Sequence, residues 1–115
     1  MSLQNISLLS LPVTLTGTVA ADRFISPAGA YASADGNTLG VARSAGDSGA
    51  KVTVDVLGTA VVEAGAAIAA NATLKVDSTG RAITWVTSGA KIGLALQAAS
   101  GAGVKIEVLL IPNVA

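Results

Sequence analysis

The sequence predicts a compact all-β domain: a small β-barrel or sandwich of short antiparallel strands with an extended apolar N-terminal arm. Polar and apolar residues alternate with period 2 in several segments, as expected for strands with one buried face. Turn-forming clusters of Gly, Asp, Asn and Ser separate these segments. Only 12% of the 115 residues are charged, whereas 51% are hydrophobic. A typical soluble domain carries about twice that share of charge, so we expect another chain to cover part of the surface.

Residues 1–16 form the N-terminal arm or first strand, and residues 17–115 form a single β domain. Apolar side chains recur along the arm as far as Pro12 without the regular spacing of a helix. An apolar arm favours docking, either by adding a strand to a neighbour or by lying on it. The alternative is an ordinary first strand of the barrel. The arm residues expected at an interface with a sister subunit or another partner are Leu3, Ile6, Leu8, Leu9 and Leu11.

Alternation is clearest in residues 50–57 and 104–111. In the second of these, Lys105 and Glu107 are expected to face solvent while Ile106 faces the core; Asp55 takes the corresponding polar position in the first. Shorter predicted strands are residues 73–76 and 81–86. Turns are predicted at residues 35–37, 46–49, 77–80, 88–89 and 100–101.

Residues 62–72 are rich in Ala and have high helix propensity. Gly65 and Asn71 limit any helix to two turns, which is too short to be stable alone. We therefore expect a bend or a single helical turn that links two strands.

Two segments, about residues 38–57 and 92–111, resemble each other. In each, a strand that begins at Gly is followed by a turn of small residues and then by an alternating strand led by Lys. The glycines, Gly40 and Gly93, indicate a bulge or a close approach of another backbone. The resemblance predicts two similarly built hairpins, or it reflects shared composition alone.

Composition excludes several functional classes. The chain has no His and no Cys, so it lacks imidazole bases, thiolate nucleophiles and the usual zinc ligands. Seven basic residues balance seven acidic residues, and no basic stripe is present for binding nucleic acid. No run reaches the ~20 apolar residues of a membrane-spanning helix, and the first residues lack the features of a signal peptide. We expect a soluble, unprocessed protein without a cofactor.

Carboxylates are the remaining option for acid–base chemistry. Asp55, Glu63 and Asp77 are the candidates for a small carboxylate-dependent hydrolase, which is a remote alternative because aspartates in turns usually accept hydrogen bonds from their own backbone. The segment 77–81 lacks the further acidic ligands of a calcium loop. Trp85 is either an interface anchor or a core residue.

A spaced pattern of Gly, Ala and β-branched residues runs through about residues 38–112. It comprises Gly40–Ala42, residues 51–58, 62–65, Ile68, Leu74, residues 77–82, 92–95 and 104–112. In this pattern the chain resembles the small capsid cement, or decoration, proteins of tailed double-stranded DNA phages and prophages.

The resemblance implies a β-rich fold and a homotrimer attached to the outside of the phage capsid, where it bridges capsomers and stabilises the head. It implies the major capsid protein and sister copies as partners, synthesis in the host bacterial cytoplasm, and no catalytic residues. A trimeric receptor- or glycan-binding module of a fibre or tail is the alternative.

Overall fold

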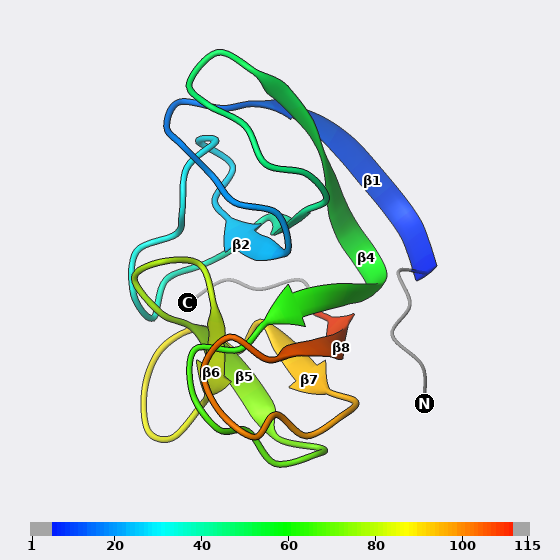
Figure 1. Ribbon diagram of the computed structural model, residues 1–115, viewed down its shortest axis with the longest axis vertical. Helices are drawn as coiled ribbons and strands as arrows, with labels where there is room; N and C mark the ends of the chain where they lie inside the picture. The colour runs from blue at the N-terminus through cyan, green and yellow to red at the C-terminus, as the bar shows by residue number, and fades with distance from the viewer. Residues whose placement is uncertain (1–5, 112–115) are drawn as a thin grey trace.

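The computed structural model describes residues 6–111, which contain strands and no helix. The all-β prediction is confirmed: the strands form one antiparallel sheet that curves into a nearly closed barrel (Figure 1). The strands are β1 (Ile6–Thr14), β2 (Arg23–Ile25), β3 (Gly40–Ala42), β4 (Lys51–Glu63), β5 (Thr73–Val76), β6 (Ala82–Thr84), β7 (Gly93–Ala95) and β8 (Lys105–Leu110).

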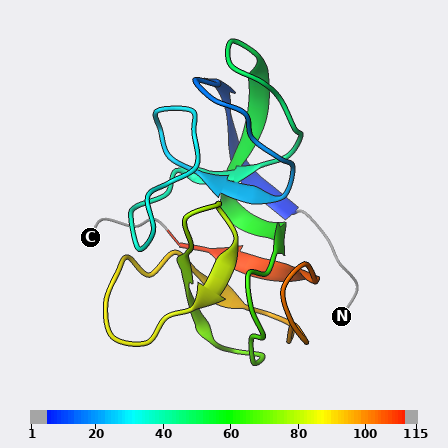
Figure 2. The same ribbon diagram turned by 60° about the vertical axis from the view of Figure 1, so that its left-hand side comes forward.

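The order of strands in the sheet is β2-β3-β4-β8-β7-β5-β6, and β1 also pairs with β4. β4 therefore lies at the centre of the fold. In Figure 1 it runs down beside β1, turns, and continues toward β8. Figure 2 shows the two halves that result, with β1–β3 on one side of the turn and β5–β8 on the other.

The turn in β4 occurs at Gly58. This residue has a φ of 106°, a conformation that side chains with a Cβ rarely adopt. A Cβ at this position would lie 2.0 Å from the Ile6 carbonyl oxygen. The β1–β4 register is irregular beside it, between Ser7 and Ser10. Gly58 thus allows one 13-residue strand to serve both halves of the sheet.

The expected link at residues 62–72 begins later than the sequence indicates. Val62 and Glu63 are the last residues of β4, and no helical turn follows among the described residues. Val62 and Ala64 are fully buried in the core, so packing overrides the helix propensity of this Ala-rich segment.

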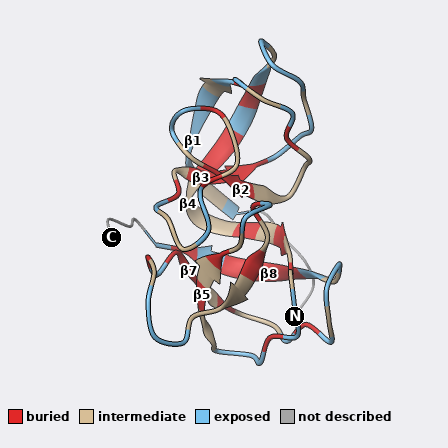
Figure 3. Ribbon diagram, turned by 90° about the vertical axis from the view of Figure 1, so that its left-hand side faces the viewer, coloured by how far each residue is buried: buried red, intermediate tan, exposed pale blue. Residues whose placement is uncertain are grey.

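The core consists of two clusters of buried side chains (Figure 3). The larger cluster surrounds Leu74, Ile106 and Val108 and also contains Phe24 and Val41. The smaller cluster is built by Leu15, Val19, Ile25, Ala42, Val52 and Val54. Each half of the sheet therefore has its own apolar centre.

Gly40 and Gly93 lie where another segment approaches closely, as the sequence predicts. A Cβ on Gly40 would lie 2.1 Å from the Asp55 carbonyl oxygen, and one on Gly93 would lie 2.6 Å from Cγ1 of Val108. Neither space admits a larger side chain.

The predicted exposure of two acidic residues in the two long strands is wrong. Asp55 and Glu107, expected to face solvent, are only 1% and 3% exposed. The buried carboxylate of Asp55 forms an ion pair with the more exposed side chain of Arg43. Glu107 lies on the outer side of the sheet but is covered there, and its Oε1 has no hydrogen-bond partner.

Candidate interaction surface

β1 carries four of the seven exposed large apolar side chains of the described residues. Leu8 is 79% exposed, and Ile6, Leu9 and Leu11 are also exposed. The strand is paired with β4 along its length, and Val13 near its end also packs against the smaller core cluster. Leu3 lies outside the described residues. Four of the five predicted arm residues therefore present apolar surface to the surroundings.

The free edge of β1 is poorly suited to strand addition. The amide and carbonyl of Leu15 bond to Ala50 and Gly49 at the start of β4. Because backbone groups alternate along a strand, the same groups of Val13 and Leu11 face β4, and those of Pro12 face outward. Pro12 has no N–H to donate there, a common protection of edge strands. Side chains, not a backbone ladder, are thus the binding groups of β1.

A second apolar surface crosses the outer side of the sheet. Ile6 lies opposite Thr59, Thr59 opposite Leu109, and Leu109 opposite Leu94. Directly opposed residues in antiparallel strands point to the same face, so these four side chains form a row over β1, β4, β8 and β7. Leu109 is 40% exposed and Leu94 is half-buried. The sequence analysis missed this row.

The other face of the same strands is the core. Ala60, Val108 and Ala95 form the neighbouring row, and all three are fully buried. An antiparallel sheet of this kind usually has polar residues on its outer face. Here Leu94 and Leu109 form an apolar part of an outer face that also carries Lys105 and Glu107 further along β8.

Trp85 follows β6 and is half-buried. Its indole Nε1 donates a hydrogen bond to the Gly89 carbonyl at 2.9 Å, and Nζ of Lys91 lies 4.5 Å from the ring centroid. The Trp85 amide donates to the Thr73 carbonyl, which places it at the β5 end of the sheet. β4, β8 and β7 separate it from β1, so the predicted interface residues form two groups.

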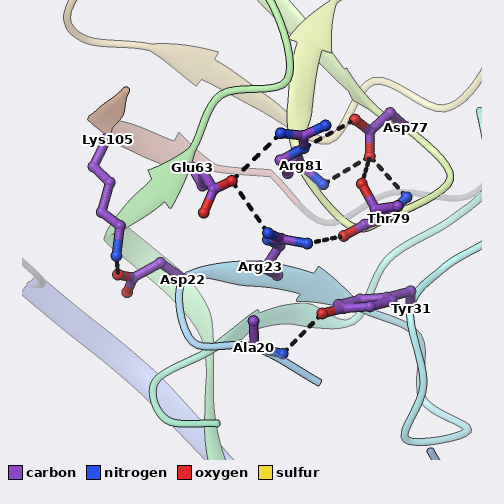
Figure 4. A network of polar contacts seen from close by, with 9 residues as sticks. All are labelled: Ala20, Asp22, Arg23, Tyr31, Glu63, Asp77, Thr79, Arg81 and Lys105. Carbon is purple, nitrogen blue, oxygen red and sulfur yellow. Dashed lines mark hydrogen bonds and ion pairs between the residues drawn. The ribbon is translucent and has the colours of Figure 1, made fainter. Parts of the chain in front are cut away.

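The candidate carboxylates do not form a catalytic pair. Glu63 accepts hydrogen bonds or ion pairs from both Arg23 and Arg81 (Figure 4). Asp77 Oδ1 accepts from the amides of Thr79 and Arg81, as expected for an aspartate in a turn. Asp55 is bound by Arg43. Each carboxylate therefore has a structural role within the fold.

No metal-binding cluster of three or more acidic residues occurs in residues 6–111. Within the same range, no helix is long and apolar enough to cross a membrane.

The proteins to which this chain is similar are phage proteins. No curated protein sequence matches the chain. The crystal structure of the head fiber gp8.5 N base in bacteriophage phi29 has a similar fold, with a TM-score of 0.71 and 20% sequence identity over 90% of this chain and 93% of that chain. The family model described as phage cement protein matches residues 3–110. The chain therefore belongs to the phage cement protein family.

Proposed function

We propose that the protein binds the outside of a phage capsid as a homo-oligomer, a trimer, and stabilises the head by bridging capsomers. Its partners are the major capsid protein and other copies of itself, and it is made in the host bacterial cytoplasm before it joins the virion. The observation that carries the proposal is the exposed apolar surface on β1 and on the outer face of β4, β8 and β7. Membership of the phage cement protein family supports a phage capsid as the partner of that surface.

The physical properties of the chain suit this role. Its net charge is zero, so many copies can crowd one particle without mutual repulsion. Each copy needs only a modest affinity for the shell, because an oligomer that binds several sites at once raises the overall affinity. Added contacts across capsomer boundaries then oppose the outward pressure of the packaged DNA.

The proposal is tested by adding the purified protein to heads that lack it. We expect saturable occupancy at a fixed stoichiometry and heads that withstand higher temperature before releasing DNA. The matched variants are Ile6→Ser/Leu8→Ser on β1 and Ala102→Ser in an exposed loop. The first should lose occupancy and the second should keep it. No occupancy by the unmodified protein would contradict the proposal.

A fibre- or tail-associated module that binds a receptor or glycan is the second candidate. The similar phi29 protein is the base of a head fiber, so the fold suits a base that supports a projecting segment. Binding to a glycan array or to host cells, without binding to heads, would favour this candidate over the first.

We propose no enzymatic activity for the chain. The carboxylates Asp55, Glu63 and Asp77 are all engaged by arginines. Hydrolysis of a glycan or peptide substrate that Glu63→Gln abolishes, with the fold retained, would revive the hydrolase alternative.

A further inference from the structure

The two halves of the sheet share one pattern of strand pairing. Residues 10–14 of β1 pair with residues 51–55 of β4 in continuous antiparallel register. Residues 59–63 of β4 pair with residues 105–109 of β8 in the same way. β4 thus closes the first pattern and opens the second, with Gly58 between the two parts.

The turns of the two halves correspond as well. Gly49 and Gly103 both have positive φ, 92° and 87°, and their amides donate to the carbonyls of Leu15 and Ala64. Residues 15 and 64 directly follow the two opening strands. Two further hydrogen bonds of the first half have a counterpart in the second. The bond from Asp22 N to Ala42 O corresponds to that from Asn71 N to Ala95 O. The bond from Val19 N to Gly46 O corresponds to that from Ile68 N to Ala99 O.

The buried residues follow the same correspondence. We call residues 10–57 unit A and residues 59–111 unit B. The six core residues of unit A are Leu15, Val19, Ile25, Ala42, Val52 and Val54, and their counterparts in unit B are Ala64, Ile68, Leu74, Ala95, Ile106 and Val108. Every one of these twelve side chains is buried.

Unit A packs against unit B through side chains outside its own core. Phe24, Ala32 and Val41 belong to the larger cluster, whose other buried members all come from unit B. Phe24 lies opposite Val41, and Val41 lies opposite Asp55, on β2, β3 and β4. This row is the part of unit A that joins it to unit B.

The counterpart row on unit B is only partly covered by the other described residues. We define the tail face as the counterparts of Phe24, Ala32, Val41 and Asp55, which are Thr73, Trp85, Leu94 and Leu109. Leu109 is exposed, and Thr73, Trp85 and Leu94 are half-buried. The four corresponding residues of unit A are all buried.

The complementary surface on unit A is also only partly covered: Val13, Leu39 and Val56 contact the smaller core cluster but are half-buried. Ala60, Val62, Ile92 and Leu110 of unit B lie in the cluster that receives unit A. Their counterparts in unit A are Leu11, Val13, Leu39 and Val56, which we define as the head face. Leu11 is 39% exposed where Ala60 is fully buried, and the other three are only half-buried.

We infer that copies of this chain associate head to tail, with the tail face of one copy seated on the head face of the next. The contact reproduces between chains the packing of unit A on unit B within one chain. It is heterologous, because two different surfaces meet, and such a contact closes into a ring when the rotation permits. This inference rests on the proposed self-association and assigns the surfaces that produce it.

One difference between the units supports this assignment. In unit A, Arg43 covers the buried carboxylate of Asp55. The amides of Arg43 and Leu96 make corresponding bonds, to the carbonyls of Thr53 and Glu107, so Leu96 and Leu109 occupy the positions of this ion pair in unit B. Unit B has therefore replaced a charged pair by two leucines on a face that solvent reaches.

The first experiment introduces into unit B the counterpart of the Arg43–Asp55 ion pair of unit A. The variant Leu96→Arg/Leu109→Asp should fold, because unit A accommodates the same pair, and it should sediment as a monomer where the unmodified protein is an oligomer. The control Ala98→Arg/Ala102→Asp carries the same charges on the exposed β7–β8 loop and should remain an oligomer. Circular dichroism reports the fold of each. Leu109→Ser, at a side chain already 40% exposed, is a milder tail variant and should weaken association at least about tenfold.

The second experiment mixes a tail variant with a head variant. Leu11→Asp alone should also be monomeric. A mixture of Leu11→Asp with Leu96→Arg/Leu109→Asp should form a one-to-one pair by native mass spectrometry, since one intact head and one intact tail remain. A monomeric unmodified protein, an oligomeric tail variant, or a mixture that stays monomeric would overturn the inference. These measurements need no heads, so a failure here is distinct from a failure to bind the capsid.

Discussion

At the scale of single residues, Asp55 shows how this chain uses its few charges. The carboxylate is 1% exposed, while the Arg43 side chain that binds it is 45% exposed. A buried carboxylate is costly unless it is paired and hydrogen-bonded. The ion pair therefore stabilises an acidic residue in the row of Phe24, Val41 and Asp55 that joins the two units. The arginine remains partly in contact with water.

Removing Arg43 alone should lower the free energy of unfolding more than removing Arg43 and Asp55 together. We expect Arg43→Leu to lower the free energy of unfolding by about 1–3 kcal/mol, because it leaves a buried carboxylate without its cation. Arg43→Leu/Asp55→Leu should recover most of that loss, since the corresponding residues in unit B are leucines. Urea denaturation measures both, and a double variant no more stable than the single one would contradict this account.

Leu8 tests whether the apolar surface of β1 serves binding or folding. Its side chain is 79% exposed, and substitution of such residues usually changes stability by less than about 0.5 kcal/mol. Leu8→Ser should therefore keep the thermal midpoint within a few degrees and lower the occupancy of heads. A large loss of stability instead would assign Leu8 to the fold.

At the scale of secondary-structure elements, β4 decides the architecture. It pairs with β1 and β3 before Gly58 and with β8 after it. The change of direction depends on the positive φ of Gly58 and on the absence of a Cβ beside the Ile6 carbonyl. One strand can belong to two units only because this residue is glycine.

Gly58→Ala should consequently destabilise the protein by roughly 2 kcal/mol or more, through backbone strain and a clash with β1. The matched control is Gly101→Ala, because a Cβ there meets no atom within 4 Å. We expect the control to unfold at nearly the same urea concentration as the unmodified chain. Equal midpoints for the two variants would show that β4 tolerates a side chain at its turn.

The sequence predicts strands well where alternation is regular and poorly where packing decides. Residues 51–57 and 105–110 are found as strands, and so is Thr73–Val76. The end of β4 escapes prediction because Val62 and Glu63 open the Ala-rich segment 62–72, which suits a helix locally. Burial of Val62 against distant strands makes this end extended. Local propensity contains no information about those partners.

The candidate surface was predictable to a similar degree. The irregular apolar series in β1 indicates Ile6, Leu8 and Leu9 as interface residues, and their side chains are exposed in the structure. Leu94 and Leu109 were not identifiable, because each stands among other apolar residues that are buried. Which of two adjacent leucines in β8 faces the core depends on the register with β4.

At the scale of the whole molecule, a polar network ties the two halves together. Arg23 on β2 binds Glu63 at the end of β4 and the Thr79 carbonyl, and Arg81 reaches the same Glu63 oxygen at 3.5 Å. Figure 4 shows both guanidinium groups directed at this carboxylate. Glu63 thus links strands from unit A with the turn before β6.

Glu63→Gln should weaken this link. With the charge removed, two partly buried arginines face each other, and we expect a loss of about 1–2 kcal/mol in the free energy of unfolding. The loss should shrink in 1 M NaCl, where salt screens the remaining repulsion. Thermal denaturation at low and high salt measures it, and a loss independent of salt would point to packing alone.

The pairing of the nine-residue strand β1 along β4 also has a mechanical consequence. Ladder hydrogen bonds lie perpendicular to the strands, so a force directed along β1 loads them together, whereas a force across the sheet would open them one after another. A tether that leaves the molecule through β1 is therefore held in shear. The molecule can then transmit tension from β1 to its central strand, β4, without unravelling from its end.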